Sequence, residues 1–291
     1  MTYADSRPRL KVLGVTQDGG MPHPGCNCSN CSRARSDARE RRLPACLALL
    51  EGGSQAWHLL EATPQLPLQL EQIMHGVPAR PLMESVFLTH AHIGHYTGLM
   101  HLGREVMGAV NVPVYAGTGM DTVLRTHAPW SQLVELGNIE VRPLQSGKPV
   151  SLSAELTITP LAVNHRNEFS ETFGFIIRGP RASALFIPDI DRWSDNDFDI
   201  RELVTSVDYS FLDATFFSAD ELPGRNMVEI PHPPVRQTME LLQPVVDRGA
   251  AKVFFIHLNH SNPLQDRQSE AYSEVVARGF NLAEELMEIP L

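Results

Sequence analysis

Residues 89–99 read Thr-His-Ala-His-Ile-Gly-His-Tyr-Thr-Gly-Leu and follow directly on the apolar run Ser-Val-Phe-Leu at 85–88. Alternate side chains of an extended chain share one face, so His90 and His92 are expected to point the same way from a strand end. His95 then opens the following turn or helix and can lean back toward the same point. Imidazole is the commonest protein ligand for catalytic divalent metals. This density of histidines predicts a metal site rather than a set of solvated surface side chains.

The composition of the 291-residue chain is that of an ordinary water-soluble protein, with 43% hydrophobic and 20% charged residues. Its net charge of −10 argues against a nucleic-acid partner, although a local basic rim can still hold an anionic small molecule. Residues 1–9 contain no apolar signal core, and no run approaches the roughly 20 apolar residues that span a bilayer. We therefore expect a cytoplasmic protein with a small-molecule substrate and no membrane partner. The oligomeric state stays open, with a homodimer as one option.

Short apolar strand candidates recur along the whole chain without a composition break or linker, which favours a single domain over residues 1–291. They cover residues 10–15, 45–50, 57–60, 86–89, 112–115, 156–163, 173–177, 184–187, 210–212 and 252–256. Helical patterns cover residues 66–75, 97–107, 120–127, 235–246 and 266–286. Many strands are connected too closely for helical crossovers, so we expect two mostly antiparallel sheets with helices outside. This is a four-layer αββα sandwich of the α/β class.

Three of the four cysteines, Cys26, Cys28 and Cys31, crowd into one six-residue segment. Disulfides are rare in cytosolic proteins, and this spacing suits thiolates that share one zinc ion better than pairing among themselves. The segment therefore predicts a small zinc-binding loop at residues 19–31. Cys46 lies in an apolar run and is expected to be a small buried residue of a strand.

Three further candidate ligands stand at the carboxyl ends of apolar strand candidates. His165 follows the run at 156–163, Asp189 follows 184–187 and His257 follows 252–256. A lone histidine after a strand is usually a surface residue. Together with the histidines at 90–95, however, these side chains are expected to converge on one edge of the sandwich.

The order of these residues resembles the metallo-β-lactamase superfamily, whose signature is His-x-His-x-Asp-His followed by a later His, an Asp and a final His. The resemblance runs from about residue 10 to residue 263 and implies the αββα metallo-β-lactamase fold. It also implies that His90, His92 and His165 hold a first metal. A second metal would then belong to His95, Asp189 and His257, with Asp189 as the bridge.

Gly94 departs from the family pattern, which has Asp at this position. In that pattern the Asp is a ligand of the second metal and orients the attacking water, so we expect a weaker second site here, down to a single ion. A tight turn that needs positive φ is an alternative reason for the glycine. Asp18, in Gln17-Asp18-Gly19-Gly20, is either a partner of a metal-binding histidine or a turn residue.

The cysteine segment resembles two groups within the superfamily. A phosphodiesterase of the carbon–phosphorus lyase pathway has three clustered cysteines plus a histidine, which implies His260 as the fourth ligand of the structural zinc; Cys46 and His23 are rivals. Residues 14–20, 26–31 and 257–263 also resemble the pyrroloquinoline quinone biosynthesis protein B group, described as metal-dependent biosynthetic enzymes with an oxidative role. That group does not keep the leading histidines, whereas His90 and His92 are present here.

The leading functional hypothesis is a metallohydrolase in which one or two Zn, Mn or Fe ions activate water against a small ester or phosphodiester. Asp189 would orient the water, His232 could shuttle a proton, and Arg225 could clamp a carboxylate or phosphate. An ordinary loop ion pair or hydrogen bond is the alternative for the last two. The rival hypotheses are an iron-dependent oxidative enzyme of cofactor biosynthesis and a non-catalytic metal-binding protein.

Overall fold

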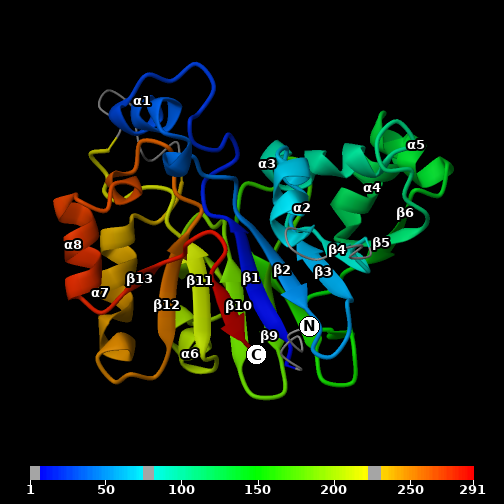
Figure 1. The fold of residues 1–291 in the computed structure, drawn as a ribbon. Helices are drawn as coiled ribbons and strands as arrows, with labels where there is room; N and C mark the ends of the chain where they lie inside the picture. Colours follow the sequence, from blue (N-terminus) through cyan, green and yellow to red (C-terminus); the bar gives the residue numbers. More distant parts are fainter. Residues whose placement is uncertain (1–6, 75–81, 222–230) are drawn as a thin grey trace.

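The computed structural model describes residues 7–74, 82–221 and 231–291, and within them two seven-stranded sheets face each other (Figure 1). The first sheet has the order β14 (Glu288–Pro290), β1 (Arg9–Gly14), β2 (Cys46–Leu50), β3 (Trp57–Leu60), β4 (Ser85–Phe87), β5 (Val112–Ala116) and β6 (Ile139–Pro143). The second has the order β13 (Asn281–Leu282), β12 (Lys252–Ile256), β11 (Tyr209–Asp213), β10 (Ser183–Ile187), β9 (Thr172–Arg178), β8 (Thr157–Val163) and β7 (Val150–Ser151).

Both sheets are mixed, which corrects the expectation of mostly antiparallel strands. In the first sheet the neighbours from β14 to β3 pair antiparallel and those from β3 to β6 pair parallel. In the second, β7 to β10 pair antiparallel and β10 to β13 pair parallel. Helices that sequence reading missed supply part of the crossovers, among them α6 (Ile200–Thr205) between β10 and β11. Parallel neighbours bring their carboxyl ends to one edge, and this arrangement builds the site.

Alternating side chains divide the core into three layers of packing. Leu47 and Leu49 of β2 point into the central cluster between the sheets, whereas Ala48 and Leu50 join the outer cluster of the first sheet. Phe87, Phe175, Phe186 and Phe211 meet in the central cluster from both sheets. This period of two is what a strand buried on both faces requires, and it confirms the predicted sandwich of two sheets.

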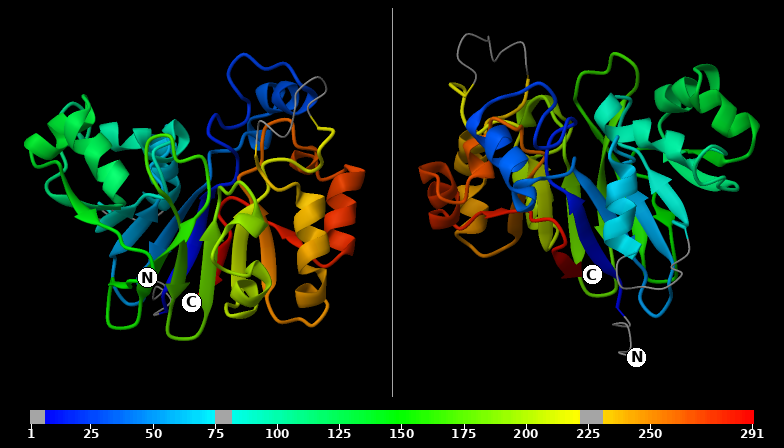
Figure 2. Two further views of the ribbon diagram at one scale, coloured as in Figure 1. Left: turned by 180° about the vertical axis from the view of Figure 1, so that it is seen from behind. Right: turned by 45° about the horizontal axis from the view of Figure 1, so that its top comes forward.

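Helices cover the outer face of each sheet and complete the four layers (Figure 2). The first sheet packs against α2 (Leu66–Met74), α4 (Thr118–Thr126) and α5 (Trp130–Glu135). The second packs against α6, α7 (Val235–Val246) and α8 (Glu270–Ala277). The αββα class is therefore confirmed. No helix in the described parts of the chain has the length and apolar character needed to cross a membrane.

Two predicted helices are wrong in extent. The pattern at 97–107 forms only a 3-10 helix, Thr97–Leu102, because Gly103 and Gly108 lead the chain into turns. The pattern at 266–286 forms only α8, because Gly279 adopts a left-handed conformation (φ 83°) that ends the helix. The chain beyond it adds β13 and β14 to the edges of the two sheets.

Candidate metal centre

The carboxyl ends of four strands carry the predicted ligands to one edge of the sandwich. His90 follows β4, His165 follows β8, Asp189 follows β10 and His257 follows β12. His257 has a left-handed backbone (φ 66°), a conformation that a non-glycine residue keeps only where surrounding structure fixes it. His95 reaches the same place from the short helix α3 (Ile93–Tyr96).

Four of these residues form a first group that could hold a metal ion. The ligand atoms of His90, His92, His165 and Asp189 all lie within 4.8 Å of one another. His92 turns Nδ1 inward, 2.7 Å from His90 Nε2 and 3.3 Å from His165 Nε2. The set of three imidazoles and one carboxylate predicted for one edge is thus brought together.

A second group of possible ligands lies beside the first and contains Asp18, His95 and His257. Asp18 Oδ1 is 3.2 Å from His95 Nε2 and 3.8 Å from His257 Nε2. Asp189 Oδ2 reaches both groups, at 3.4 Å from His165 Nε2 and also 3.4 Å from His95 Nε2. This carboxylate therefore lies between the two groups, where a bridging ligand would be.

Asp18 also overturns the expectation that Gly94 leaves the second group one carboxylate short. A Cβ atom on residue 94 would lie 1.9 Å from Asp18 Oδ1 and 2.4 Å from its Cγ. The Asp18 carboxylate thus fills the space beside Gly94 from a different part of the chain. Gly94 does not have a positive φ, so the glycine is needed for space and not for a tight turn.

Each of five histidines has an oxygen atom from outside the two groups near its far nitrogen. The pairs are His90 Nδ1 with Thr89 Oγ1 at 2.8 Å, His92 Nε2 with Glu168 at 3.1 Å, His165 Nδ1 with Asp191 at 2.8 Å, His95 Nδ1 with Glu61 at 3.3 Å and His257 Nδ1 with Thr215 Oγ1 at 3.1 Å. Such partners orient metal-binding imidazoles and fix their tautomers. Glu61, Glu168 and Asp191 were not predicted from the sequence. Glu61 could have been found as a carboxylate directly after an apolar strand, and Asp191 from its Asp-x-Asp spacing to Asp189.

Burial and neighbouring charges shift the pKa values of several buried side chains of the site. Burial lowers the pKa of His90 well below its usual value and also lowers the pKa of His165. Burial opposes ionisation of Asp189, but the charges of His165, His257 and His232 outweigh it and hold the pKa of Asp189 well below its usual range. Burial likewise lowers the pKa of His95, but Glu61 and Asp18 outweigh it and raise that pKa well above normal. The same excess of carboxylate charge would stabilise a metal cation at this site.

The polar atoms of the site fit metal ions better than they fit each other. Asp18 Oδ1, His95 Nε2 and His257 Nε2 are buried and have no hydrogen-bond partner among the described residues. Such orphaned groups are costly in a protein interior, and here they converge on one point. Nitrogen and carboxylate oxygen are the donors that zinc, manganese and Fe(II) accept. The two groups therefore support metal binding.

His232, predicted as a proton shuttle, lies beside this centre from the chain just before α7. Its Nδ1 is 2.8 Å from Asp213 Oδ2 and 3.3 Å from Asp189 Oδ1, and its side chain is only 1% exposed. Burial lowers the pKa of His232, but the carboxylates of Asp213 and Asp189 outweigh it and raise that pKa to about 9. Arg225, the predicted clamp for an anion, lies outside the described residues.

The cysteine segment forms a separate group with His260, as the resemblance implied. Cys26 and Cys28 Sγ lie 3.4 and 3.6 Å from His260 Nδ1, and Cys31 completes the group. Bond lengths of about 2.3 Å to sulfur and about 2.0 Å to nitrogen place tetrahedral zinc ligands roughly 3.6 Å apart, so the four side chains fit one zinc ion. Burial raises the pKa of Cys31 to about 12, which a bound cation would reverse.

The two rivals for the fourth position lie outside this group. Cys46 is buried in β2, and its thiol donates to the carbonyl of Glu61 at 3.5 Å. His23 packs its ring against His260 with 4.4 Å between ring centroids, and its backbone N–H donates to Cys31 Sγ. His23 is therefore a neighbour of the zinc-binding group and not a member of it.

Comparison with known proteins agrees with this geometry. A family model described as the β-lactamase superfamily domain matches residues 56–258. Coenzyme PQQ synthesis protein B of Cupriavidus necator is 28% identical, with 97% of this chain and 99% of the relative covered. The protein of the same name from Ruegeria pomeroyi is 25% identical, with 97% and 100% covered.

Solved structures show the same fold over the whole chain. The Zn(2+)-bound PqqB from Methylobacterium extorquens has a TM-score of 0.81 at 20% identity, with 97% of this chain and all of that chain covered. A diphosphatase from the PhnP family has a TM-score of 0.66 at 22% identity, with 98% and 97% covered.

Proposed function

The chain belongs to the β-lactamase superfamily domain family, and on that premise we propose that it is a binuclear metallohydrolase that uses metal-activated water on a small ester or phosphodiester. The observation that carries this proposal is the pair of ligand groups that meet at Asp189 Oδ2. His90, His92 and His165 would hold one ion, and Asp18, His95 and His257 the other. A centre with both sets complete is suited to hydrolysis.

The chain's own residues supply orientation and proton transfer. When bound, the ions lower the pKa of a water molecule toward neutrality and polarise the carbonyl or phosphoryl oxygen of the substrate. Asp189 would accept a hydrogen bond from the attacking water and aim it at the reacting atom. The water oxygen then bonds to the carbonyl carbon or phosphorus, its proton passes to solvent, and the bond to the leaving oxygen breaks.

His232 completes the reaction as the general acid. Its raised pKa, about 9, keeps the imidazole protonated at neutral pH. Asp213 fixes the ring through Nδ1, so Nε2 is the atom left to donate a proton to the leaving oxygen. A separate zinc ion at Cys26, Cys28, Cys31 and His260 would be structural, because four protein ligands close its coordination sphere.

A second candidate is an iron-dependent oxidative enzyme of cofactor biosynthesis. It is favoured by the full-length similarity to proteins named coenzyme PQQ synthesis protein B. Histidine and carboxylate ligands suit Fe(II) as well as zinc. Anaerobic loading with Fe(II), followed by oxygen-uptake measurements with and without candidate substrates, separates this candidate from the hydrolase.

The hydrolase proposal is tested by metal-loaded protein in a screen of phosphodiesters and esters. Zn(II), Mn(II) and Fe(II) are loaded separately, and His92→Ala and Asp189→Ala are compared with His127→Ala, an exposed histidine outside both groups. We expect the first two to lose roughly 10³-fold in kcat/KM, equivalent to about 4 kcal/mol, and His127→Ala to retain activity. Near-full turnover in either of the first two variants, or no turnover with any metal, would overturn the proposal.

A further inference from the structure

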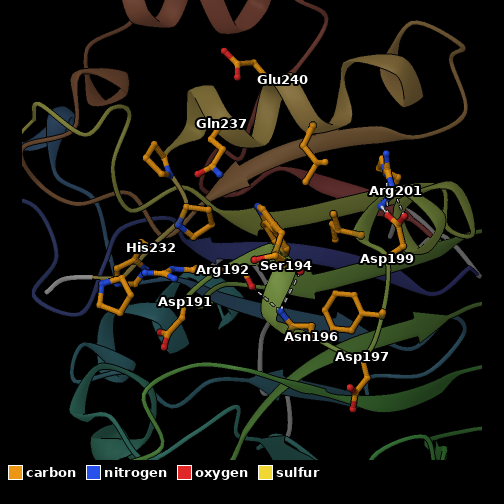
Figure 3. A pocket seen from close by; sticks show the side chains of 17 residues that line it. Asp191, Arg192, Ser194, Asn196, Asp197, Asp199, Arg201, His232, Gln237 and Glu240 are labelled. Atoms are coloured by element: carbon orange, nitrogen blue, oxygen red, sulfur yellow. Dashed lines mark hydrogen bonds and ion pairs between the residues drawn. The ribbon is translucent and has the colours of Figure 1, made fainter. Parts of the chain in front are cut away.

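A large cavity opens beside the metal centre, between residues 191–201 and the start of α7 (Figure 3). Its volume is about 1030 Å³, which matches the upper range of small-molecule sites. Figure 3 shows His232, Asp191 and Arg192 together at one end, Asp199 and Arg201 at the other, and Gln237 and Glu240 along the α7 wall. One end of the cavity thus borders the candidate metal centre, and the other end lies away from it.

The cavity and the metal centre share two residues. Asp191 lines the cavity and also holds His165 Nδ1 at 2.8 Å. His232 lines the cavity, and its buried Nε2 has no hydrogen-bond partner among the described residues. An orphaned nitrogen on a side chain that is 1% exposed indicates a polar partner that arrives with the ligand.

Apolar side chains form part of the cavity lining. Trp193, Ile200 and Leu241 form part of its lining, and the Trp193 indole N–H donates to Thr238 at 2.9 Å, which fixes the ring. The Asp199–Arg201 ion pair lies at the far end, with 2.6 Å between oxygen and nitrogen. The apolar side chains of the lining offer contact to the hydrocarbon part of a ligand.

We infer that this cavity binds the leaving group of the substrate, an aryl or bulky alkyl alcohol joined through the oxygen that faces His232 Nε2. The apolar side chains of the lining, Trp193, Ile200 and Leu241, take the hydrocarbon part. Arg192, next to His232 in Figure 3, supplies positive charge beside an anionic reacting group. The role of the bound alcohol as a leaving group rests on the proposed hydrolytic function, but the binding of an aromatic alcohol does not depend on turnover.

Filling the cavity tests the inference. Gln237 is an exposed residue of the α7 wall, so Gln237→Trp narrows the cavity without disturbing the core, whereas Gln237→Ala leaves it open. The matched control is Gln132→Trp, an exposed glutamine of α5 on the outer face of the other sheet. The probe is 1-naphthol, whose binding to zinc-loaded protein is measured by calorimetry. We expect Gln237→Trp to weaken binding by roughly tenfold or more, and the other two variants to bind as the wild type does.

A second arm compares ester and phosphodiester substrates that share one reacting group and differ only in a methyl or naphthyl leaving group. The wild type should favour the naphthyl substrate by roughly tenfold or more in kcat/KM, and Gln237→Trp should lose this preference while it keeps turnover of the methyl substrate. Equal naphthol binding by all variants overturns the cavity assignment even if hydrolysis is present. Cavity-dependent naphthol binding without any turnover upholds the cavity and refutes the hydrolase instead.

Discussion

Asp18 supplies the carboxylate that the family pattern places at position 94, and this replacement makes the sharpest prediction. A single methyl group added at position 94 should remove one metal ion. In Gly94→Ala the new Cβ would lie 1.9 Å from Asp18 Oδ1, and ordinary contact begins only at 3.4 Å. The carboxylate must therefore retreat by about 1.5 Å. Carboxylate–zinc bonds are about 2.0–2.2 Å long, so a retreat of this size breaks the bond. The substitution itself causes no backbone strain, since residue 94 lies in α3 without a positive φ.

We expect Gly94→Ala to weaken the second active-site ion by about 100-fold, equivalent to about 2.8 kcal/mol, while the first ion and the cysteine-bound zinc stay in place. Metal content at limiting zinc and competition with a chromogenic chelator measure this difference. Asp18→Ala should show the same loss. The double variant Asp18→Ala/Gly94→Ala should lose no more than either single variant, because both changes remove the same ligand.

A rescue experiment decides between this account and general damage to α3. Asp18→Ala/Gly94→Asp restores the carboxylate position of the family pattern and should regain the second ion to within about tenfold of the wild type. Gly94→Ala protein that binds the second ion as tightly as the wild type would refute the reasoning. Additive losses in Asp18→Ala/Gly94→Ala would refute it too, since they would show that residues 18 and 94 act independently.

Three further changes have distinct expected outcomes. Glu168→Gln should weaken the ion held by His92 by roughly 10- to 100-fold, because it replaces the carboxylate that orients the ring, measured by zinc competition. His260→Ala should lower the zinc content by about one ion per chain and also weaken the second active-site ion, measured by metal analysis and chelator titration. Burial raises the pKa of Glu285 to about 7 from 4.5, so the free energy of unfolding should fall as pH rises between these values. Glu285→Gln should remove this fall and stabilise the protein by up to ~3 kcal/mol at pH 8, with no gain below pH 4, measured by urea unfolding.

A specific result would contradict each of these three predictions. Unchanged zinc affinity in Glu168→Gln would mean that the 3.1 Å contact with His92 does not orient the ring. Unchanged affinity for the second active-site ion in His260→Ala would show that the cysteine-bound site and the active site bind metal independently. Exposed Glu155 is the control for Glu285, and its change to Gln should shift stability by less than about 0.5 kcal/mol; a pH-independent gain in Glu285→Gln would show that burial of charge is not the cause.

Local periodicity predicted the fold well, because central strands such as β2, β3 and β10 are buried on both faces and therefore read as short apolar runs. The mixed pairing could not be predicted in the same way. Strand direction depends on crossovers, and α6, with only six residues, is too short to show a helical period. The helical pattern at 266–286 misled because the packed apolar residues Phe280, Leu282 and Ala283, in and beside β13, continue the spacing past Gly279.

The ligands predicted from the sequence are those that follow strands, since the chain direction fixes where a strand's last side chain points. Asp18 was ambiguous for a physical reason: its place opposite Gly94 depends on how the loop after β1 crosses the site. Glu61 was missed because a buried carboxylate on a left-handed backbone (φ 76°) departs from every local preference. Such departures occur where function requires them.

The same two segments that supply Asp18 and His257 also build the cysteine-bound site, and this explains how a carboxylate from a loop can replace one from a helix. The Gln17 N–H donates to the carbonyl of Leu258 at 2.9 Å, which joins the Asp18 loop to the strand end of His257. Farther along both segments, the Asn30 side chain donates to the carbonyl of His260 at 3.0 Å, and Cys26 and Cys28 meet the ring of His260. A zinc ion at that point would clamp together the two segments that also carry ligands of the second active-site ion. The carboxylate of Asp18 would then owe its fixed position to a metal outside the active site, whereas an aspartate at position 94 would be fixed by α3 itself.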